Sequence, residues 1–404
     1  MLSVEDYRAQ VLAGVKALAP IEMPLLDAHG CVLATEVSAP WPLPSFDNSS
    51  MDGYAVVAAD LAGATGEHPV QLTVVDDVPA GFRATEVVGP GVAIRIMTGA
   101  PMPEGADAVV PVEKTDGGTD LVQINEPVSS GANIRLAGED VLLGEVVMRP
   151  GTYLTSRQLS LLASVGKGSV LVHPKPRVVV ISTGSELVEP GTQLRKGLIT
   201  DSNSFLLVAA AQEAGAVAFR VPPVIDDEGV FMSTLEDQLH FADLIVTSGG
   251  VSMGAYDTVK AVLSKLGTVT FTKVAMNPGM PQGHGRIGPN GTPIITLPGN
   301  PVSAYVSFET FVRPVIRTMQ GHQEIYRPYV QAICEVELAS PPAKRQFVRA
   351  KFGGAQKATV APVRGQGSHA VGGLSQVDCF IVIPAGQASV AAGATVDVID
   401  LRNW

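Results

Sequence analysis

The chain has 404 residues, of which 46% are hydrophobic and 17% are charged, and its formal net charge is −11. A chain of this length and composition is globular rather than disordered, and we expect it to form roughly two to four domains. The excess of acidic residues argues against general binding to nucleic acid or to membrane surfaces. No apolar run reaches the ~20 residues of a membrane span.

The cysteines and the N-terminus both indicate the cytoplasm. Cys31, Cys334 and Cys379 lie far apart and match neither a disulfide framework nor a metal-ligand spacing. The first residues also lack the basic and then apolar pattern of a signal peptide. We therefore expect a cytoplasmic protein.

The N-terminal part of the chain predicts one domain inserted into another. Amphipathic helices are expected over residues 3–18 and 155–165, each of them starting at a capping residue. Residues 46–133 instead alternate short β-type runs with Gly and Pro turns, which predicts a small all-β domain. Residues 1–45 and 134–173, with the two helices, are then expected to form a discontinuous N-terminal domain around that insertion.

The remainder of the chain predicts an α/β domain followed by a β-barrel. Over residues 174–323, short strands alternate with helices, as is typical of a three-layer, doubly wound α/β sheet covered on both faces. Its last helix is expected over residues 301–319, with Asn300 as N-cap and Pro301 at the first helical position. Residues 324–404 show short strands between turns, which predicts a C-terminal β-barrel or sandwich.

Three strands of the α/β domain end in small polar turns that contain glycine: RVVVISTGSE, LIVTSGG and IITLPGN. Glycine lets the backbone turn sharply and leaves amide N–H groups free to face an anion. Because the carboxyl ends of such strands meet at one edge of a sheet, we expect these turns to form a pocket. The substrate-binding residues expected in the turns and the adjoining helix start are Thr183, Gly184, Ser185, Asp201, Ser248, Gly249, Gly250, Gly299 and Asn300.

Acidic residues follow these strands or precede the helices after them. Glu186, Asp201, Asp226 and Asp257 are all expected at this edge of the sheet. Grouped carboxylates beside free amides suit a phosphate ligand that carries Mg²⁺, because the metal takes hard oxygens and the phosphate takes N–H groups. The alternative that Asp201, Asp226 or Asp227 serves as a cap stays open, since Asp is a favoured N-cap.

Common nucleotide and hydrolase motifs do not occur in the sequence. There is neither a Gly-x-Gly-x-x-Gly after the first strand of the α/β domain nor a Gly-x-x-x-x-Gly-Lys-Ser/Thr, so the dinucleotide and P-loop interpretations are weak. The seven histidines are scattered without a pair at helical spacing. A zinc protease and a Ser-His-Asp hydrolase therefore have no support.

A set of motifs along the whole chain resembles one known family. In order they are FDNSSMDGYA, RIMTGAPMPEGADAVV, ISTGSEL, ITDSNS, TSGGVSMGAYD, LPGNPVSA and QGSH. Together they closely resemble the molybdopterin molybdenumtransferases, the MoeA family that includes the gephyrin E domain. The resemblance implies an elongated homodimer of four-domain subunits with an active-site cleft shared between the subunits. It also implies Mg²⁺-dependent insertion of molybdate into adenylylated molybdopterin, which yields molybdenum cofactor and AMP.

The same resemblance implies roles for individual residues. Matching catalytic residues are Asp52, Thr98, Asp140, Glu186, Asp226, Asp257 and Lys273, and the metal ligands among them are Glu186, Asp226 and Asp257. Further substrate-binding residues by resemblance are Pro298, Pro301, Arg349 and Ser368. Arg349 could instead form a surface ion pair, since such pairs are common.

The chain departs from the family pattern at one segment. Many members carry Lys-Pro-Gly-Lys where this chain has Asn277-Pro278-Gly279-Met280. An amide can donate a hydrogen bond but supplies no net charge to an oxyanion. Either Lys273 and Arg349 suffice, or oxyanion affinity is weaker, or the preferred substrate differs.

Two other functions remain open from the sequence. The first is a molybdopterin adenylyltransferase, since that family shares the α/β core and the Ser-Gly-Gly turn. The second is a non-catalytic pterin-binding scaffold. Partners that the resemblance implies are the adenylyltransferase and the apoenzymes that accept the cofactor, and neither nucleic acid nor a membrane is expected.

Overall fold

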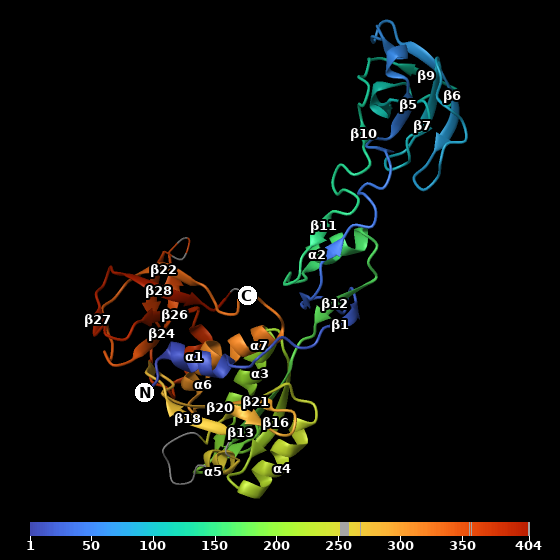
Figure 1. Cartoon of the computed structure of the whole chain (residues 1–404). Helices are drawn as coiled ribbons and strands as arrows, with labels where there is room; N and C mark the ends of the chain where they lie inside the picture. The colour runs from blue at the N-terminus through green and yellow to red at the C-terminus, as the bar shows by residue number, and fades with distance from the viewer. Residues whose placement is uncertain (251–257, 267, 355, 357, 403–404) are drawn as a thin grey trace.

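The computed structural model describes residues 1–250, 258–266, 268–354, 356 and 358–402, and it is elongated (Figure 1). The small β domain lies at one end, the α/β sheet and the C-terminal barrel lie together at the other, and a discontinuous N-terminal unit connects them (Figure 1). This arrangement confirms the predicted fold class. The residue boundaries expected for the four domains stay predictions. Within the described ranges, no helix combines the length and the apolar character needed to cross a membrane.

The inserted domain is a five-stranded sheet in the order β8-β5-β7-β6-β9. Its strands are β5 (Gly53–Val56), β6 (Val70–Val78), β7 (Val92–Ile96), β8 (Ala108–Pro111) and β9 (Leu121–Ile124), with 3₁₀ turns at Ala58–Leu61 and Val112–Lys114. Strand β5 lies between β7 and β8, and its first residue, Gly53, must be glycine. A Cβ at this position would lie 1.9 Å from the carbonyl oxygen of Val110. The all-β prediction is confirmed.

Segments from both sides of the insertion form the connecting unit. A three-stranded sheet has the order β1-β12-β2, and β3 pairs with β11. The elements are β1 (Ile21–Pro24), β2 (Val32–Leu33), β3 (Val37–Ser38), β11 (Val146–Met148), β12 (Ser169–His173) and helix α2 (Ser156–Ser164). Helix α2 begins with the predicted capping box of Thr155 and Gln158. A pair of short strands, β4 (Asn48–Ser49) and β10 (Ile134–Arg135), leads to the β domain.

The first helix differs from its prediction in length and in position. Helix α1 (Val4–Leu12) starts at the predicted N-cap, where the Ser3 hydroxyl accepts a hydrogen bond from the Asp6 backbone N–H at 3.0 Å, but it ends well before residue 18. Gly14, with a φ of 70°, follows the helix end and lets the chain turn away. The buried face of α1 packs in the core of the α/β sheet, whereas α2 packs in a separate cluster of the connecting unit.

The central sheet has six strands in the order β16-β13-β17-β21-β20-β18. The first four are parallel, and β20 runs antiparallel to both of its neighbours, β21 and the edge strand β18. Helices α3, α6 and α7 cover one face of this sheet, and α4 and α5 cover the other, so the three-layer prediction is confirmed (Figure 1). The bounds are β13 (Arg177–Thr183), α3 (Asn203–Glu213), β16 (Val217–Val224), α4 (Glu228–Leu239), β17 (Leu244–Ser248), α5 (Thr258–Lys265), β18 (Val269–Lys273), β20 (Pro281–Ile287) and β21 (Thr292–Leu297).

Strand β20 has no counterpart in the sequence-based prediction. Its sequence, PQGHGRI, contains two glycines and a single β-branched residue, so it lacks the usual strand signal. The glycines are required by close approach to both neighbours: a Cβ on Gly283 would lie 2.2 Å from the Thr296 hydroxyl, and one on Gly285 would lie 2.3 Å from the Thr268 carbonyl. Contacts that only the folded sheet creates therefore account for this strand.

The long helix predicted over residues 301–319 is present but contains a π-helical segment. Its parts are α6 (Pro301–Ser307), the π segment (Phe308–Val312) and α7 (Arg313–Met319). Pro314 lies just after the π segment and has no N–H to donate to the carbonyl of Thr310. The Arg8 guanidinium on α1 donates to that carbonyl at 3.2 Å. The first helix of the chain thus satisfies a carbonyl that the proline leaves free.

The C-terminal residues form a closed five-stranded barrel, as predicted. The strands follow the order β24-β25-β22-β28-β26, and β26 pairs back with β24. They are β22 (Tyr329–Cys334), β24 (Arg345–Gly353), β25 (Thr359–Pro362), β26 (Cys379–Ile383) and β28 (Thr395–Asp400), with the small pair β23 (Leu338–Ala339) and β27 (Ser389–Val390) and the 3₁₀ segment Val371–Gln376. A nearly buried ion pair joins the barrel region to the long helix, with Arg327 Nε 2.7 Å from Glu309 Oε2.

The crowding around Gly283 gives a test of the sheet edge. Gly283→Ala should lower the melting temperature by roughly 2–8 °C, because the added methyl group collides with Thr296 and with the Phe271 ring. Gly66→Ala is the matched control, since no heavy atom lies within 4 Å of the place that its methyl group would take. Thermal unfolding followed by circular dichroism measures both, and equal melting temperatures would contradict the packing described for β20.

Candidate active site

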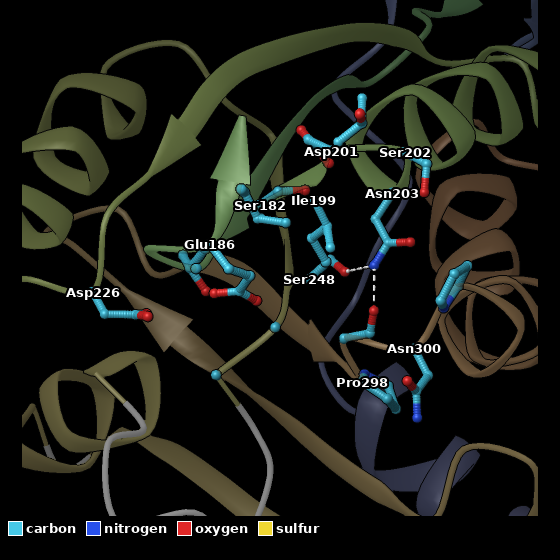
Figure 2. Close-up of a pocket in the computed structure, with 18 of the residues that line it drawn as sticks. Ser182, Glu186, Ile199, Asp201, Ser202, Asn203, Asp226, Ser248, Pro298 and Asn300 are labelled. Atoms are coloured by element: carbon cyan, nitrogen blue, oxygen red, sulfur yellow. Dashed lines mark hydrogen bonds between the residues drawn. The ribbon is translucent and has the colours of Figure 1, made fainter. Parts of the chain in front are cut away.

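A cavity of about 510 Å³ lies at the carboxyl ends of β13, β17 and β21 (Figure 2). Its position confirms the prediction that the three glycine-containing turns converge. The lining residues are Ser182, Thr183, Gly184, Glu186, Leu187, Ile199, Thr200, Asp201, Ser202, Asn203, Asp226, Ser248, Gly249, Gly250, Pro281, Pro298, Gly299, Asn300 and Pro301. The small parallel pair β14 (Leu187–Val188) and β15 (Ile199–Thr200) forms part of the wall.

The first two turns approach each other closely. Gly249 has a φ of 96°, and a Cβ on it would lie 2.5 Å from the Thr183 carbonyl oxygen. Its N–H donates to the Leu297 carbonyl at 3.2 Å, which ties the second turn to the third strand. Glycine is therefore required at position 249 by both conformation and space.

The two described acids expected to bind metal, Glu186 and Asp226, lie on one side of the cavity (Figure 2). Asp226 and Ser185 form a reciprocal pair: the Ser185 N–H donates to Asp226 Oδ2 and the Asp226 N–H donates to Ser185 Oγ, both at 3.0 Å. This pair fixes the turn after β13 against the end of β16. Asp257 lies outside the described residues, and within the described chain no group of three His, Cys, Asp or Glu side chains is arranged to hold a metal ion.

Asp227 caps a helix, as one alternative predicted. Asp201 bonds at the start of a helix and also lines the cavity. Asp227 caps α4 by accepting from the Val230 N–H at 2.9 Å. Asp201 is buried, accepts from the Ser204 N–H at 3.1 Å at the start of α3, and also lines the cavity. Arg220 lies 3.8 Å from Asp201 and compensates part of the charge of this buried carboxylate.

Asn203 is a cavity residue that the sequence analysis did not single out, although it lies in the quoted ITDSNS motif. Its side-chain Nδ2 lies 2.7 Å from both Ser248 Oγ and the Gly299 carbonyl oxygen, as the dashed lines in Figure 2 show. A polar residue at the start of a helix that borders an anion-binding turn is a sequence signal for a binding residue. The position of Asn203 alone suggests only a capping role, so the sequence did not predict it as a cavity residue.

Several polar atoms of the cavity wall have no hydrogen-bond partner among the residues that the structure describes. They are Ser182 Oγ, Thr183 Oγ1 and Asn203 Oδ1, all buried. Buried polar groups are normally hydrogen-bonded, so these three atoms mark a part of the wall that the described residues leave unsatisfied.

The C-terminal barrel reaches the cavity through the loop that carries the QGSH motif. The Asn300 side-chain amide donates to Ser368 Oγ at 3.1 Å, and the Val302 N–H donates to the Ser368 carbonyl at 3.1 Å. Arg349 is 1% exposed, so the surface ion pair is wrong for this residue. Its guanidinium donates to the carbonyls of Ala370, Gly365 and Gly367 and thereby shapes the same loop.

The segment that differs from the family pattern, Asn277 to Met280, lies between the sheet and the barrel. Asn277 belongs to β19 (Met276–Asn277), which pairs in parallel with β24 of the barrel. The Gly279 carbonyl oxygen accepts a hydrogen bond from Gln282 Nε2 at 2.6 Å. Lys273 is the cross-strand partner of the cavity residue Pro281 and is itself exposed.

Three of the residues assigned by resemblance lie away from this cavity. Asp52 and Thr98 are in the β domain, and Asp140 is in the connection below it, so none of them lines the cavity of its own chain in the described structure (Figure 1). Asp52 Oδ1 accepts from the Thr98 N–H at 2.7 Å and from the Thr98 hydroxyl at 2.8 Å. These two bonds lower the pKa of the Asp52 carboxyl from its ordinary value.

Three family models match the chain and together cover most of it. They are described as "MoeA N-terminal region (domain I and II)" over residues 2–166, "Probable molybdopterin binding domain" over residues 179–318, and "MoeA C-terminal region (domain IV)" over residues 331–401. The fold and the site therefore define a multidomain protein built around an α/β domain of the molybdopterin-binding type.

Full-length relatives make the assignment more specific. Molybdopterin molybdenumtransferase 2 of Mycobacterium tuberculosis is 47% identical over 99% of this chain and 100% of its own length, and molybdopterin molybdenumtransferase 1 of the same organism is 37% identical over 100% of both. A crystal structure of the molybdopterin biosynthesis MoeA protein from Pyrococcus horikoshii matches with a TM-score of 0.84 and 31% identity over 100% of both chains. The chain belongs to the MoeA family of molybdopterin molybdenumtransferases.

The pair of Asp52 and Thr98 makes a titration test possible. In the wild type the two hydrogen bonds favour the carboxylate, so they persist above the lowered pKa and are lost as the pH falls through it. Thr98→Val removes the hydroxyl and keeps the backbone N–H, so the pKa of Asp52 should rise part of the way to its ordinary value. NMR titration of the carboxyl carbon measures this, with the exposed Thr119→Val as control. An unchanged pKa in Thr98→Val would show that the hydroxyl contributes nothing.

Proposed function

We propose that this chain is a molybdopterin molybdenumtransferase, an enzyme of molybdenum cofactor biosynthesis that inserts molybdate into adenylylated molybdopterin and releases AMP. The observation that carries the proposal is the cavity wall, where the carboxylates of Glu186 and Asp226 lie beside backbone turns and beside hydroxyls that have no partner among the described residues. Amides and hydroxyls are the donors that a phosphate needs, and the remaining wall is wide enough for a small organic ligand. The names of the full-length relatives agree with this reaction.

The chemistry of the donor set fits Mg²⁺. Glu186 and Asp226 offer hard carboxylate oxygens at the side of the cavity where the turn after β13 would hold a phosphate. These two residues would hold the ion, with Asp257 as the third expected ligand. When bound, the ion would screen the phosphate charge and polarise the group that leaves as AMP.

The residues of the chain itself would bind and orient the two substrates. The Gly249 turn and the Ser182 and Thr183 hydroxyls would take the phosphate oxygens of the pterin nucleotide. At the other side, Asn300 and Ser368 join the LPGN turn to the barrel loop and would receive molybdate. Holding both substrates in one cavity makes transfer a proximity effect.

Arg349 would contribute to this site indirectly. Its guanidinium is engaged with three carbonyls of the loop around Ser368, so it would stabilise the shape of the oxyanion pocket. The amide of Asn277, in the strand that pairs with β24 of the barrel, would add a hydrogen-bond donor without net charge where many family members have lysine. Lower affinity for the oxyanion follows from that difference in charge.

The reaction itself tests the proposal. Purified chain incubated with adenylylated molybdopterin, molybdate and Mg²⁺ should release AMP and form molybdenum cofactor, and release should fall strongly when either molybdate or Mg²⁺ is omitted. Consumption of ATP without molybdate would indicate the adenylyltransferase instead. Absence of turnover under all conditions would leave the pterin-binding scaffold.

We further propose that the active form is a cytoplasmic homodimer whose cleft is shared between subunits. Asp52, Thr98 and Asp140 are assigned to the site by resemblance, yet they lie in or near the β domain, far from the cavity of the same chain (Figure 1). A second subunit would bring its own β domain to this cavity. The elongated shape, with a slender connection below the β domain, supports this arrangement.

Mixing two inactive variants distinguishes a shared site from a site within one chain. Asp52→Ala and Glu186→Gln should each lose at least about a hundredfold in activity. After co-expression in equal amounts, statistical dimers should recover roughly a quarter of wild-type activity, because each mixed dimer keeps one intact site. Co-expression of two differently tagged copies of Asp52→Ala is the control and should recover nothing. No recovery in the mixed sample would contradict the shared cleft.

A further inference from the structure

The side chain of Asn203 has a definite orientation in the cavity wall. The Gly299 carbonyl oxygen can only accept a hydrogen bond, so the atom 2.7 Å from it must be the nitrogen of the amide. The same nitrogen lies 2.7 Å from Ser248 Oγ. Both N–H groups of the amide are thereby used, one toward each of the two turns that border the cavity.

This orientation decides which way the Ser248 hydroxyl can act. Because Ser248 Oγ accepts from Asn203, its own proton remains available for another acceptor. Ser248 is 2% exposed, lines the cavity and immediately precedes Gly249. An unprotonated phosphate oxygen is a hydrogen-bond acceptor, so a serine whose proton is directed away from Asn203 can donate to it.

The other atom of the amide also faces no protein partner in the described part of the chain. Asn203 Oδ1 is buried and without a hydrogen bond, although it lies in a residue that lines the cavity.

The geometry points to Asn203 as a positioning residue that commits the Ser248 hydroxyl to donation and so adapts the cavity to the phosphate of a nucleotide. This inference rests on the proposed function, from which it takes AMP as the probe. It adds to that function a residue that acts through Ser248.

A double-mutant cycle on the full-length protein tests the coupling between the two residues. Asn203→Ala should weaken AMP binding roughly tenfold or more, measured by calorimetry with Mg²⁺ present, because a hydrogen bond to a charged group is lost or misdirected. In the Ser248→Ala background the same change should cost less than about twofold, since the hydroxyl that Asn203 orients is gone. Ser248→Thr should retain most of the affinity because it keeps the hydroxyl.

Asn203→Asp reverses the hydrogen bond to Ser248 and also removes the donor to the Gly299 carbonyl. A carboxylate of the same shape accepts the Ser248 proton, turns the serine lone pairs toward the phosphate and adds a negative charge, so AMP affinity should fall further than in Asn203→Ala. Asn290→Ala, an exposed residue at the opposite end of the sheet, is the matched control and should bind AMP like the wild type. Melting temperatures of all variants show whether they fold.

The outcomes are distinct for this inference and for the proposed function. Equal losses from Asn203→Ala in both serine backgrounds would mean that Asn203 only ties the Gly299 turn, and the inference would be overturned while the function stands. Wild-type protein that neither binds AMP nor releases it in the transferase reaction would overturn both.

Discussion

The site depends on one steric constraint, the close approach of the chain where β13 and β17 end. The Thr183 carbonyl oxygen occupies the space where any side chain at position 249 would begin. Glycine alone allows this contact, and the contact brings the TGS and SGG turns together over the carboxyl edge of a parallel sheet. The Gly249 N–H also donates to the Leu297 carbonyl, so the LPGN turn lies beside the other two turns. The cavity exists because three backbone turns are held within contact distance.

The long helix after the LPGN turn extends this constraint to distant parts of the chain. At its start, Val302 bonds to the loop around Ser368, so the barrel is fixed against the cavity. In its middle, the carbonyl of Thr310 is freed by Pro314 and satisfied by Arg8 from the first helix. In the same π-helical segment, Glu309 forms an ion pair with Arg327, which lies just before the first barrel strand. One buried helix thus connects the N-terminus, the site and the C-terminal barrel.

The distribution of acids over two ends of the molecule limits what a single chain can do. Glu186 and Asp226 lie at the cavity, whereas Asp52 lies in the β domain at the far end of the connecting unit (Figure 1). The α/β sheet and the β domain each have a buried core of their own, so each is packed without the other. The proposed dimer is the arrangement that lets both groups of acids serve one reaction.

Sequence alone determined the fold class, most of the helices and strands, and the convergence of three turns, because those features follow from local periodicity, capping residues and glycine-containing strand ends. It failed where a contact with a distant segment decides the local structure. Strand β20 exists because Gly283 and Gly285 fit against neighbours from elsewhere, and the first helix ends earlier than predicted and packs on the α/β sheet. The π-helical segment and the burial of Arg349 also depend on contacts with distant segments, and the sequence did not predict them. Sequence predicted that the three turns meet at one edge of the sheet with Glu186, Asp201 and Asp226, and these residues line the cavity. Only the tertiary structure placed Asn203 between two of those turns. Its partners, Ser248 and Gly299, lie 45 and 96 positions away along the chain, and hydrogen bonds over such separations leave no pattern in the sequence.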